Sequence, residues 1–223
     1  MKAGNCAYRC PEDLPAIIPV FPLPGALLLP RAELPLNIFE PRYLSMIDAA
    51  MAGKRIVGMI QPDEVAPARA CGPALCAIGC AGRITSFAET GDDRYVVTLT
   101  GISRFRIVEE LDAPTPFRQC RVTAVPYQTD FAGCLREDSV DRPSVLRTFR
   151  AYLDAHNLET DWESVDSASN ETLINALAMM APFGCAEKQA LLEAPDLRSR
   201  AETLVAITEI TLAREGGRTG TLQ

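Results

Sequence analysis

The chain has 223 residues, of which 48% are hydrophobic, and a formal net charge of −7 at pH 7. This length and composition allow one large domain or two small ones with a buried core. The acidic balance argues against tight, nonspecific nucleic-acid binding, and no apolar run approaches the roughly 20 residues that span a bilayer. Because residues 1–15 lack the apolar block of a secretory signal, we expect a cytoplasmic protein without membrane contact.

Short strand patterns separated by Gly, Pro and Asp fill residues 16–126, after an N-terminal segment, 1–15, that we expect to be flexible. In chain order, the predicted strands cover 16–23, 33–39, 55–62, 74–89, 94–101, 103–111 and 117–125. A helix is predicted from Pro41 to Gly53, because Pro fits the first helical turn and apolar residues recur at helical spacing. Seven strands and one short helix indicate a closed or nearly closed antiparallel barrel.

The hydrophobic period changes to that of helices after Asp130. We expect a linker at 127–140, a helical bundle at 141–214 and a flexible tail at 215–223. Within the bundle, the predicted helices cover 143–155, 170–181, 185–194 and 197–214, and Asp196 is expected to cap the last of them. The single histidine, His156, lies at the end of the first of these helices, where capping is favoured over catalysis.

Common catalytic and metal-binding signatures are missing from the sequence. It contains no Gly-Lys-Ser/Thr phosphate loop, no G-x-S-x-G elbow and no H-E-x-x-H motif. The eight cysteines do not form paired C-x2-C motifs, and strand alternation favours burial of Cys76 and Cys80, beside Cys71. Cys6 and Cys10 are the only serious metal-ligand candidates, and they lack a good second pair. We expect neither cofactor nor metal, and an unrecognised hydrolase with a reactive serine or cysteine stays open.

Four arginines are candidates for an RNA-binding strip. Arg104 and Arg106 alternate with apolar residues, so both guanidinium groups are expected to leave the barrel on the same side, with Arg118 and Arg121 as candidate neighbours. Aromatic side chains for base stacking are missing from that face. Surface salt bridges are therefore favoured, and an RNA-binding module is kept as the alternative function.

The segment 21–44 combines several prolines with the triplet Leu27, Leu28 and Leu29. Prolines pre-set an extended backbone, so that little conformational entropy is lost when a partner docks. We expect at least one leucine of the triplet to be exposed, as part of a polypeptide-binding surface that also includes Phe39 and Tyr43. The alternatives are that the triplet plugs one mouth of the barrel and that Phe39 and Tyr43 pack the helix onto it.

Three stretches, in order, resemble the N-terminal domain of Lon proteases: residues 18–51, 101–107 and 187–193. The resemblance implies an α+β fold, in which a PUA-like β pseudo-barrel of about six to seven mostly antiparallel strands precedes a C-terminal helical bundle. It also implies a non-enzymatic receptor for unfolded or exposed polypeptide, acting as an adaptor or weak holdase in protein quality control. We do not expect the ATPase and Ser–Lys peptidase activities of Lon here, and a separate ATPase or protease is a candidate partner.

Overall fold

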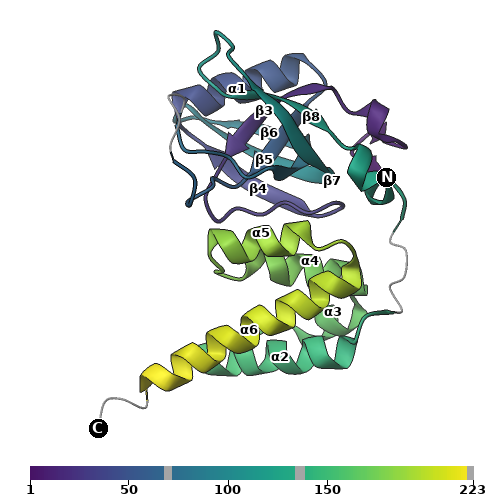
Figure 1. Ribbon diagram of the computed structural model, residues 1–223, viewed down its shortest axis with the longest axis vertical. Coiled ribbons are helices and arrows are strands. Elements are labelled where there is room, and N and C mark those ends of the chain that lie inside the picture. Colours follow the sequence, from purple (N-terminus) through teal and green to yellow (C-terminus); the bar gives the residue numbers. More distant parts are fainter. Residues whose placement is uncertain (68–71, 134–138, 220–223) are drawn as a thin grey trace. The chain divides into compact units, whose positions relative to one another are not determined.

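The computed structural model describes residues 1–67, 72–133 and 139–219, and it divides the chain into two compact units (Figure 1). The first unit comprises residues 1–133 and 182–192, and the second comprises 134–181 and 193–223. The segment 182–192, which we expected in the bundle, therefore belongs with the barrel. None of the helices in the described ranges combines the length and apolarity needed to cross a membrane.

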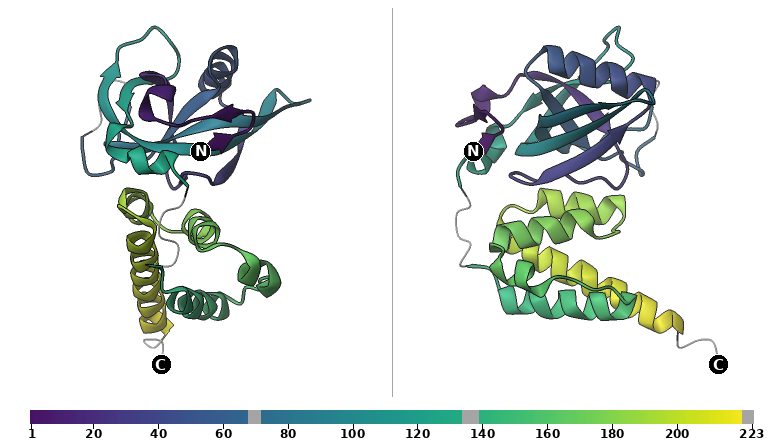
Figure 2. Two further views of the ribbon diagram at one scale, coloured as in Figure 1. Left: turned by 90° about the vertical axis from the view of Figure 1, so that its right-hand side faces the viewer. Right: turned by 180° about the vertical axis from the view of Figure 1, so that it is seen from behind.

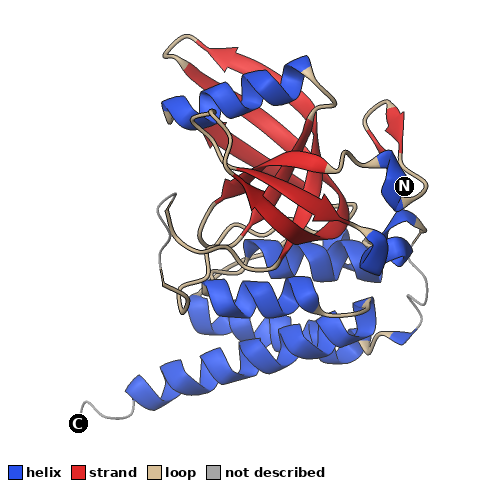
Figure 3. Cartoon of the chain, turned by 45° about the horizontal axis from the view of Figure 1, so that its top comes forward, coloured by secondary structure: helices blue, strands red, loops and turns tan. Residues whose placement is uncertain are grey.

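A six-stranded mixed sheet forms the first unit (Figure 3). Its strands are β3 (Ile17–Pro22), β4 (Glu33–Ile38), β5 (Ile56–Ile60), β6 (Ile78–Thr90), β7 (Arg94–Leu111) and β8 (Gln119–Thr123). The strand order is β4-β7-β6-β5-β3-β8, and β8 also pairs with β7. The five strands from β7 to β8 therefore close into a ring, from which β4 extends beside the first half of β7. Among the pairings of these six strands, only that of β3 with β5 is parallel, so the sheet is mostly antiparallel, as predicted. The closed ring of strands confirms the predicted pseudo-barrel.

Strand β7 is continuous where the sequence predicted two strands. Gly101 suggested a break, yet the strand runs on and pairs first with β4 and later with β8. A Cβ atom at Gly101 would lie 2.1 Å from the carbonyl oxygen of Leu29. The glycine is thus required by the close approach of the loop 23–32 to the strand and does not mark a turn.

Helix α1 (Pro41–Ala52) forms where it was predicted and lies against the sheet (Figure 3). Pro41 occupies the first turn, where its missing N–H costs no helical hydrogen bond. The buried face of the helix carries Tyr43, Met46, Ile47 and Ala50. The ring of Tyr43 packs against that of Phe21 in β3, with 4.2 Å between the ring centroids.

The N-terminal segment is folded, so the expectation that residues 1–15 are flexible is wrong. It forms the hairpin of β1 (Lys2–Ala3) and β2 (Cys6–Ala7), followed by the 3-10 helix η1 (Pro11–Asp13). Ala3 and Tyr8 are buried in the core of the first unit. The terminal amino group of Met1 donates to the carbonyl oxygen of Phe131 at 2.8 Å. Apolar burial and this hydrogen bond together explain why the segment is ordered.

The 3-10 helix η2 (Val125–Phe131) occupies the start of the expected linker 127–140. Tyr127, Asp130 and Phe131 on this helix are buried. Phe131 belongs to the barrel core, so residues up to 131 extend the first unit. Residues 134–138, in the remainder of that expected linker, and Cys71 lie outside the described residues.

Four helices form the described part of the second unit: α2 (Arg142–His156), α3 (Trp162–Ser167), α4 (Asn170–Met180) and α6 (Leu197–Thr219) (Figure 2). The short helix α3 was not predicted, although Asp161 caps it by accepting hydrogen bonds from the backbone N–H groups of two residues of its first turn. Asp196 accepts a hydrogen bond from the backbone N–H of Ser199 at 2.8 Å, as expected of a cap. Helix α6 continues through part of the expected tail, and residues 220–223 lie outside the described ranges.

Candidate functional site

The leucine triplet is buried, so the expectation that at least one of its side chains is exposed is wrong. Leu27, Leu28 and Leu29 are 2%, 1% and 0% exposed. The loop that carries them packs against β6 and β7 at two glycines, Gly82 and Gly101. A Cβ atom at Gly82 would lie only 2.7 Å from Cδ2 of Leu28. Glycines in the strands make room for Leu28 and for the backbone of Leu29, so this loop packs against β6 and β7. Gly82 and Gly101 in otherwise regular strand patterns were the available signal.

Tyr43 is also withdrawn from solvent, whereas Phe39 is not. Tyr43 is 7% exposed, and burial raises the pKa of its hydroxyl group. Phe39, the first residue after β4, is 61% exposed. The two aromatic residues therefore differ: Tyr43 packs α1 onto the barrel, and Phe39 is the one predicted binding residue that solvent reaches.

Phe39 lies at the end of a small apolar surface on the outer side of β4, β7 and β6. In the strand register, Val96 of β7 lies between Asn37 of β4 and Ala88 of β6. Val96 is 43% exposed, and Ala88 and Asn37 are also exposed. Strand alternation places Phe39 on the same side as Asn37, two residues away. We call Phe39, Val96 and Ala88 the Phe39 surface.

A charged residue borders the Phe39 surface. The guanidinium carbon of Arg94 lies 5.9 Å from the centre of the Phe39 ring, within range of a cation–π contact. Arg94 also pairs with Asp92, with its Nε 3.0 Å from a carboxylate oxygen, and both side chains are at least half exposed. An apolar surface with a polar rim is typical of protein-binding sites, although this one is small.

Arg104 is not exposed to solvent, which corrects the expectation that it contributes to an arginine strip. Alternation does place Arg104 and Arg106 on one face of β7, but η2 covers that face at Arg104. The Arg104 side chain is 4% exposed and its guanidinium carbon lies 4.9 Å from the centre of the Tyr127 ring, whereas Arg106 is exposed. A sequence pattern defines the face of a strand and does not reveal what packs on it.

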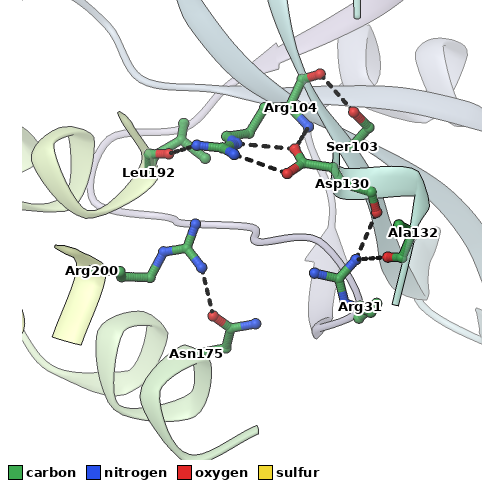
Figure 4. A network of polar contacts seen from close by, with 8 residues as sticks. All are labelled: Arg31, Ser103, Arg104, Asp130, Ala132, Asn175, Leu192 and Arg200. Carbon is green, nitrogen blue, oxygen red and sulfur yellow. Dashed lines mark hydrogen bonds and ion pairs between the residues drawn. The ribbon is translucent and has the colours of Figure 1, made fainter. Parts of the chain in front are cut away.

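Asp130 of η2 holds Arg104 through three hydrogen bonds (Figure 4). Its carboxylate accepts from Nε, from a terminal guanidinium nitrogen and from the backbone N–H of Arg104, each at 2.9 Å. Burial lowers the pKa of Arg104, but the contacts with Asp130 outweigh it and the net shift is upward. Arg104 also donates to the carbonyl oxygen of Leu192 in α5 (Cys185–Glu193) at 3.4 Å. One side chain thus ties η2 and α5 to the barrel.

Arg118 and Arg121 form ion pairs along β8. Nε of Arg118 donates to Glu110 at 2.5 Å, and another of its guanidinium nitrogens donates to the carbonyl oxygen of Pro73 at 2.8 Å. Arg121 lies opposite Glu109 in the strand register and pairs with it at 3.3 Å. Three of the four arginines therefore form ion pairs, but only the pair of Arg121 lies at the surface, as the sequence had suggested.

The described cysteines and the histidine give little support to catalytic or metal chemistry. Burial raises the pKa of the Cys185 thiol, and a hydrogen bond with Glu12 raises that of Cys10, so neither is activated as a thiolate. Nδ1 of His156 lies 2.8 Å from the carbonyl oxygen of Tyr152, consistent with a helix-end role. Within the described residues, no three His, Cys, Asp or Glu side chains, those of Cys6 and Cys10 included, could hold a metal ion.

A buried lysine escaped the sequence analysis. Lys188 of α5 is 6% exposed, and burial lowers the pKa of its amino group. The neighbouring Gln189 donates to the carbonyl oxygen of Ile78 at 3.1 Å, which fixes this helix to β6. The charged residues around Lys188 made the helix resemble an exposed one, so nothing in the local pattern indicated burial.

Comparison with known proteins connects both units to one family. The family described as the ATP-dependent protease La (LON) substrate-binding domain matches residues 17–209. Lon protease 2 of Myxococcus xanthus is 26% identical over 200 residues, which cover 88% of this chain and 24% of that protein. Lon protease of Desulfosudis oleivorans is 33% identical over 96 residues, which cover 43% of this chain and 12% of that protein. The chain spans at most about a quarter of the length of these relatives.

Two solved structures have the same fold. The Lon N-terminal domain protein from Xanthomonas campestris matches with a TM-score of 0.56 and 22% identity, over 85% of this chain and 97% of that one. The N-terminal domain of Lon protease from the Mycobacterium avium complex matches with a TM-score of 0.59 and 20% identity, over 86% and 98% of the two chains.

Proposed function

Because the chain belongs to the ATP-dependent protease La (LON) substrate-binding domain family, we propose that it recognises polypeptides through the Phe39 surface. The observation that carries this proposal is the exposure of Phe39, which directly follows β4. Its ring is 61% exposed, and a partner that covers it removes apolar surface from water. The partner is an unfolded or exposed segment with apolar side chains.

The rigidity of the surface supports this role. Val96 and Ala88 lie on paired strands whose register fixes their spacing, and Phe39 directly follows β4. A partner therefore docks on side chains that are already in place, and the entropic cost of ordering falls mainly on the partner. Weak and reversible binding is the expected result for so small a surface.

We propose further that the chain acts as an adaptor or weak holdase, which retains a polypeptide until a separate ATPase or protease receives it. The proposal requires no covalent step from the residues described above. RNA binding is the less supported alternative, because Arg104, Arg118 and Arg121 already pair with acidic side chains. Those pairs would have to break before the arginines could contact phosphate groups.

Fluorescence anisotropy with labelled, reduced and carboxymethylated lactalbumin tests the proposal. We expect binding in the micromolar range, and the change Phe39→Ser should weaken it at least about 5-fold, as truncation of an aromatic binding residue does. The matched control is Val108→Ser, which alters a side chain of similar exposure, 60%, elsewhere on β7. Equal binding by both variants, or no binding by the parent protein, would refute the assignment.

A further inference from the structure

A groove of about 540 Å³ lies within the second unit, between the N-terminal end of α2 and one face of α6. Its volume falls within the range of ligand sites, about 300–1,000 Å³. Val145 of α2 and Ala201 of α6 are buried at its base, Val205 is half-buried, and Ala206 is exposed. Because these side chains are small, the backbone of a partner helix can approach α6 closely.

Exposed apolar side chains continue along α6 beyond the groove. Ile210 lies one turn after Ala206 on α6 and is 51% exposed. Residues four apart share one face of a helix, so Ala206 and Ile210 form a continuous strip. Both side chains face solvent and are not covered by the described part of the second unit.

Acidic side chains dominate the rim of the groove. Asp141, Glu202 and Glu209 line it together with a single cation, Arg198. Arg198 pairs with Glu202 at 2.8 Å, but both side chains are more than 60% exposed, so the pair is weak. Among the residues that the structure describes, none forms a hydrogen bond or ion pair with the Glu209 side chain. A cationic partner would therefore meet a complementary charge.

The spacing of the two glutamates selects the conformation of that partner. Glu202 and Glu209 are seven residues apart on α6, which corresponds to about 10.5 Å along the helix axis. A second helix with Lys or Arg at positions i and i+7 has the same spacing on one face, and its residues i+3 and i+4 would meet Val205 and Ala206. Same-side residues of an extended chain recur at about 6.8 or 13.6 Å, which fits less well.

We propose that the groove binds a basic amphipathic helix, with cations at i and i+7 and apolar residues at i+3 and i+4. The inference rests on the proposed function, polypeptide recognition, and adds a second surface with its own substrate class. Helix-in-groove recognition uses this pattern of anchors. The Phe39 surface and the groove then accept different segments: apolar ones at the former and basic helical ones at the latter.

A designed peptide tests the groove on the complete 223-residue chain. The probe is a labelled 18-residue helix with Lys at i and i+7 and Leu at i+3 and i+4, and its counterpart carries Glu in place of both lysines. The double change Glu202→Gln and Glu209→Gln should weaken binding of the Lys peptide about 3- to 10-fold, since it removes two exposed ion pairs. The matched control, Glu159→Gln with Glu163→Gln, alters charge equally at exposed positions outside the lining of the groove.

The measured affinities decide between support and refutation. Selective weakening by the groove variant, with rejection of the Glu peptide, supports the proposal. Equal affinity of the groove and control variants, equal affinity for both peptides, or no binding of the Lys peptide overturns it. Binding of carboxymethylated lactalbumin is measured in parallel. If Phe39→Ser loses this binding and the parent protein does not bind the Lys peptide, the groove proposal fails and the proposed function stands.

Discussion

Replacement of Asp130 by Ala should be among the most destabilising changes at a polar residue of the first unit. The carboxylate of Asp130 accepts three hydrogen bonds at 2.9 Å from Arg104, and the two side chains are 8% and 4% exposed. Removal of Asp130 leaves the guanidinium group charged and buried without its main partner. Breaking such a pair costs about 3–5 kcal/mol in the free energy of unfolding. For a chain of this size, the melting temperature should fall by roughly 6–20 °C.

Urea unfolding followed by far-UV circular dichroism measures the effect, with Asp92→Ala as control. Asp92 pairs with Arg94 at 3.0 Å, but both side chains are at least half exposed, so the loss should stay below about 1 kcal/mol. The double change Arg104→Met with Asp130→Leu should recover part of the stability, because it removes the buried charge. If Asp130→Ala lowers the free energy of unfolding no more than the control does, the view that this buried ion pair stabilises the fold is refuted.

Two further changes test the packing of the barrel. Gly101→Ala should lower the free energy of unfolding by about 1–3 kcal/mol, measured in urea, because the new Cβ atom would lie 2.1 Å from the carbonyl oxygen of Leu29. The control, Gly91→Ala, should be nearly neutral, because no atom lies within 4 Å of its Cβ position. Equal effects of the two changes would contradict the close approach. Lys188→Met should raise the free energy of unfolding relative to the parent protein at neutral pH. Burial lowers the pKa of Lys188 in the folded state, so the protonated amino group destabilises the fold at a pH below the unfolded pKa of 10.5. The gain from the substitution should therefore shrink as the pH rises toward 10.5. Lys54→Met at an exposed turn is the control, and a pH-independent difference for Lys188→Met would count against the burial effect.

The strand and helix patterns predicted most of the architecture, because alternation and helical spacing are local properties. Helix α1 was recognised from apolar residues at helical spacing between Pro41 and Gly53, and the cap Asp196 from its place just before the last helix. Strand β7 was divided in error at Gly101, since a glycine that permits close approach and one that marks a turn have the same local pattern.

The candidate site depended on contacts between distant segments and was predicted less well. Leu28 is covered because it fits against Gly82, 54 positions along the chain, and Arg104 is covered because Asp130 packs on it. No local pattern contains such information. Phe39 was selected from an extended, proline-rich segment, but its exposure follows from its position at the end of β4, where alternation turns its ring away from the barrel.

The two units are interleaved along the chain, because residues 182–192 return to the first unit before the chain completes the second. Neither unit can therefore be excised as one continuous fragment. A fragment that stops at residue 133 lacks α5, and with it the Leu192 carbonyl oxygen that accepts from Arg104. Separate expression of the barrel would need residues 182–192 joined to its end through a linker.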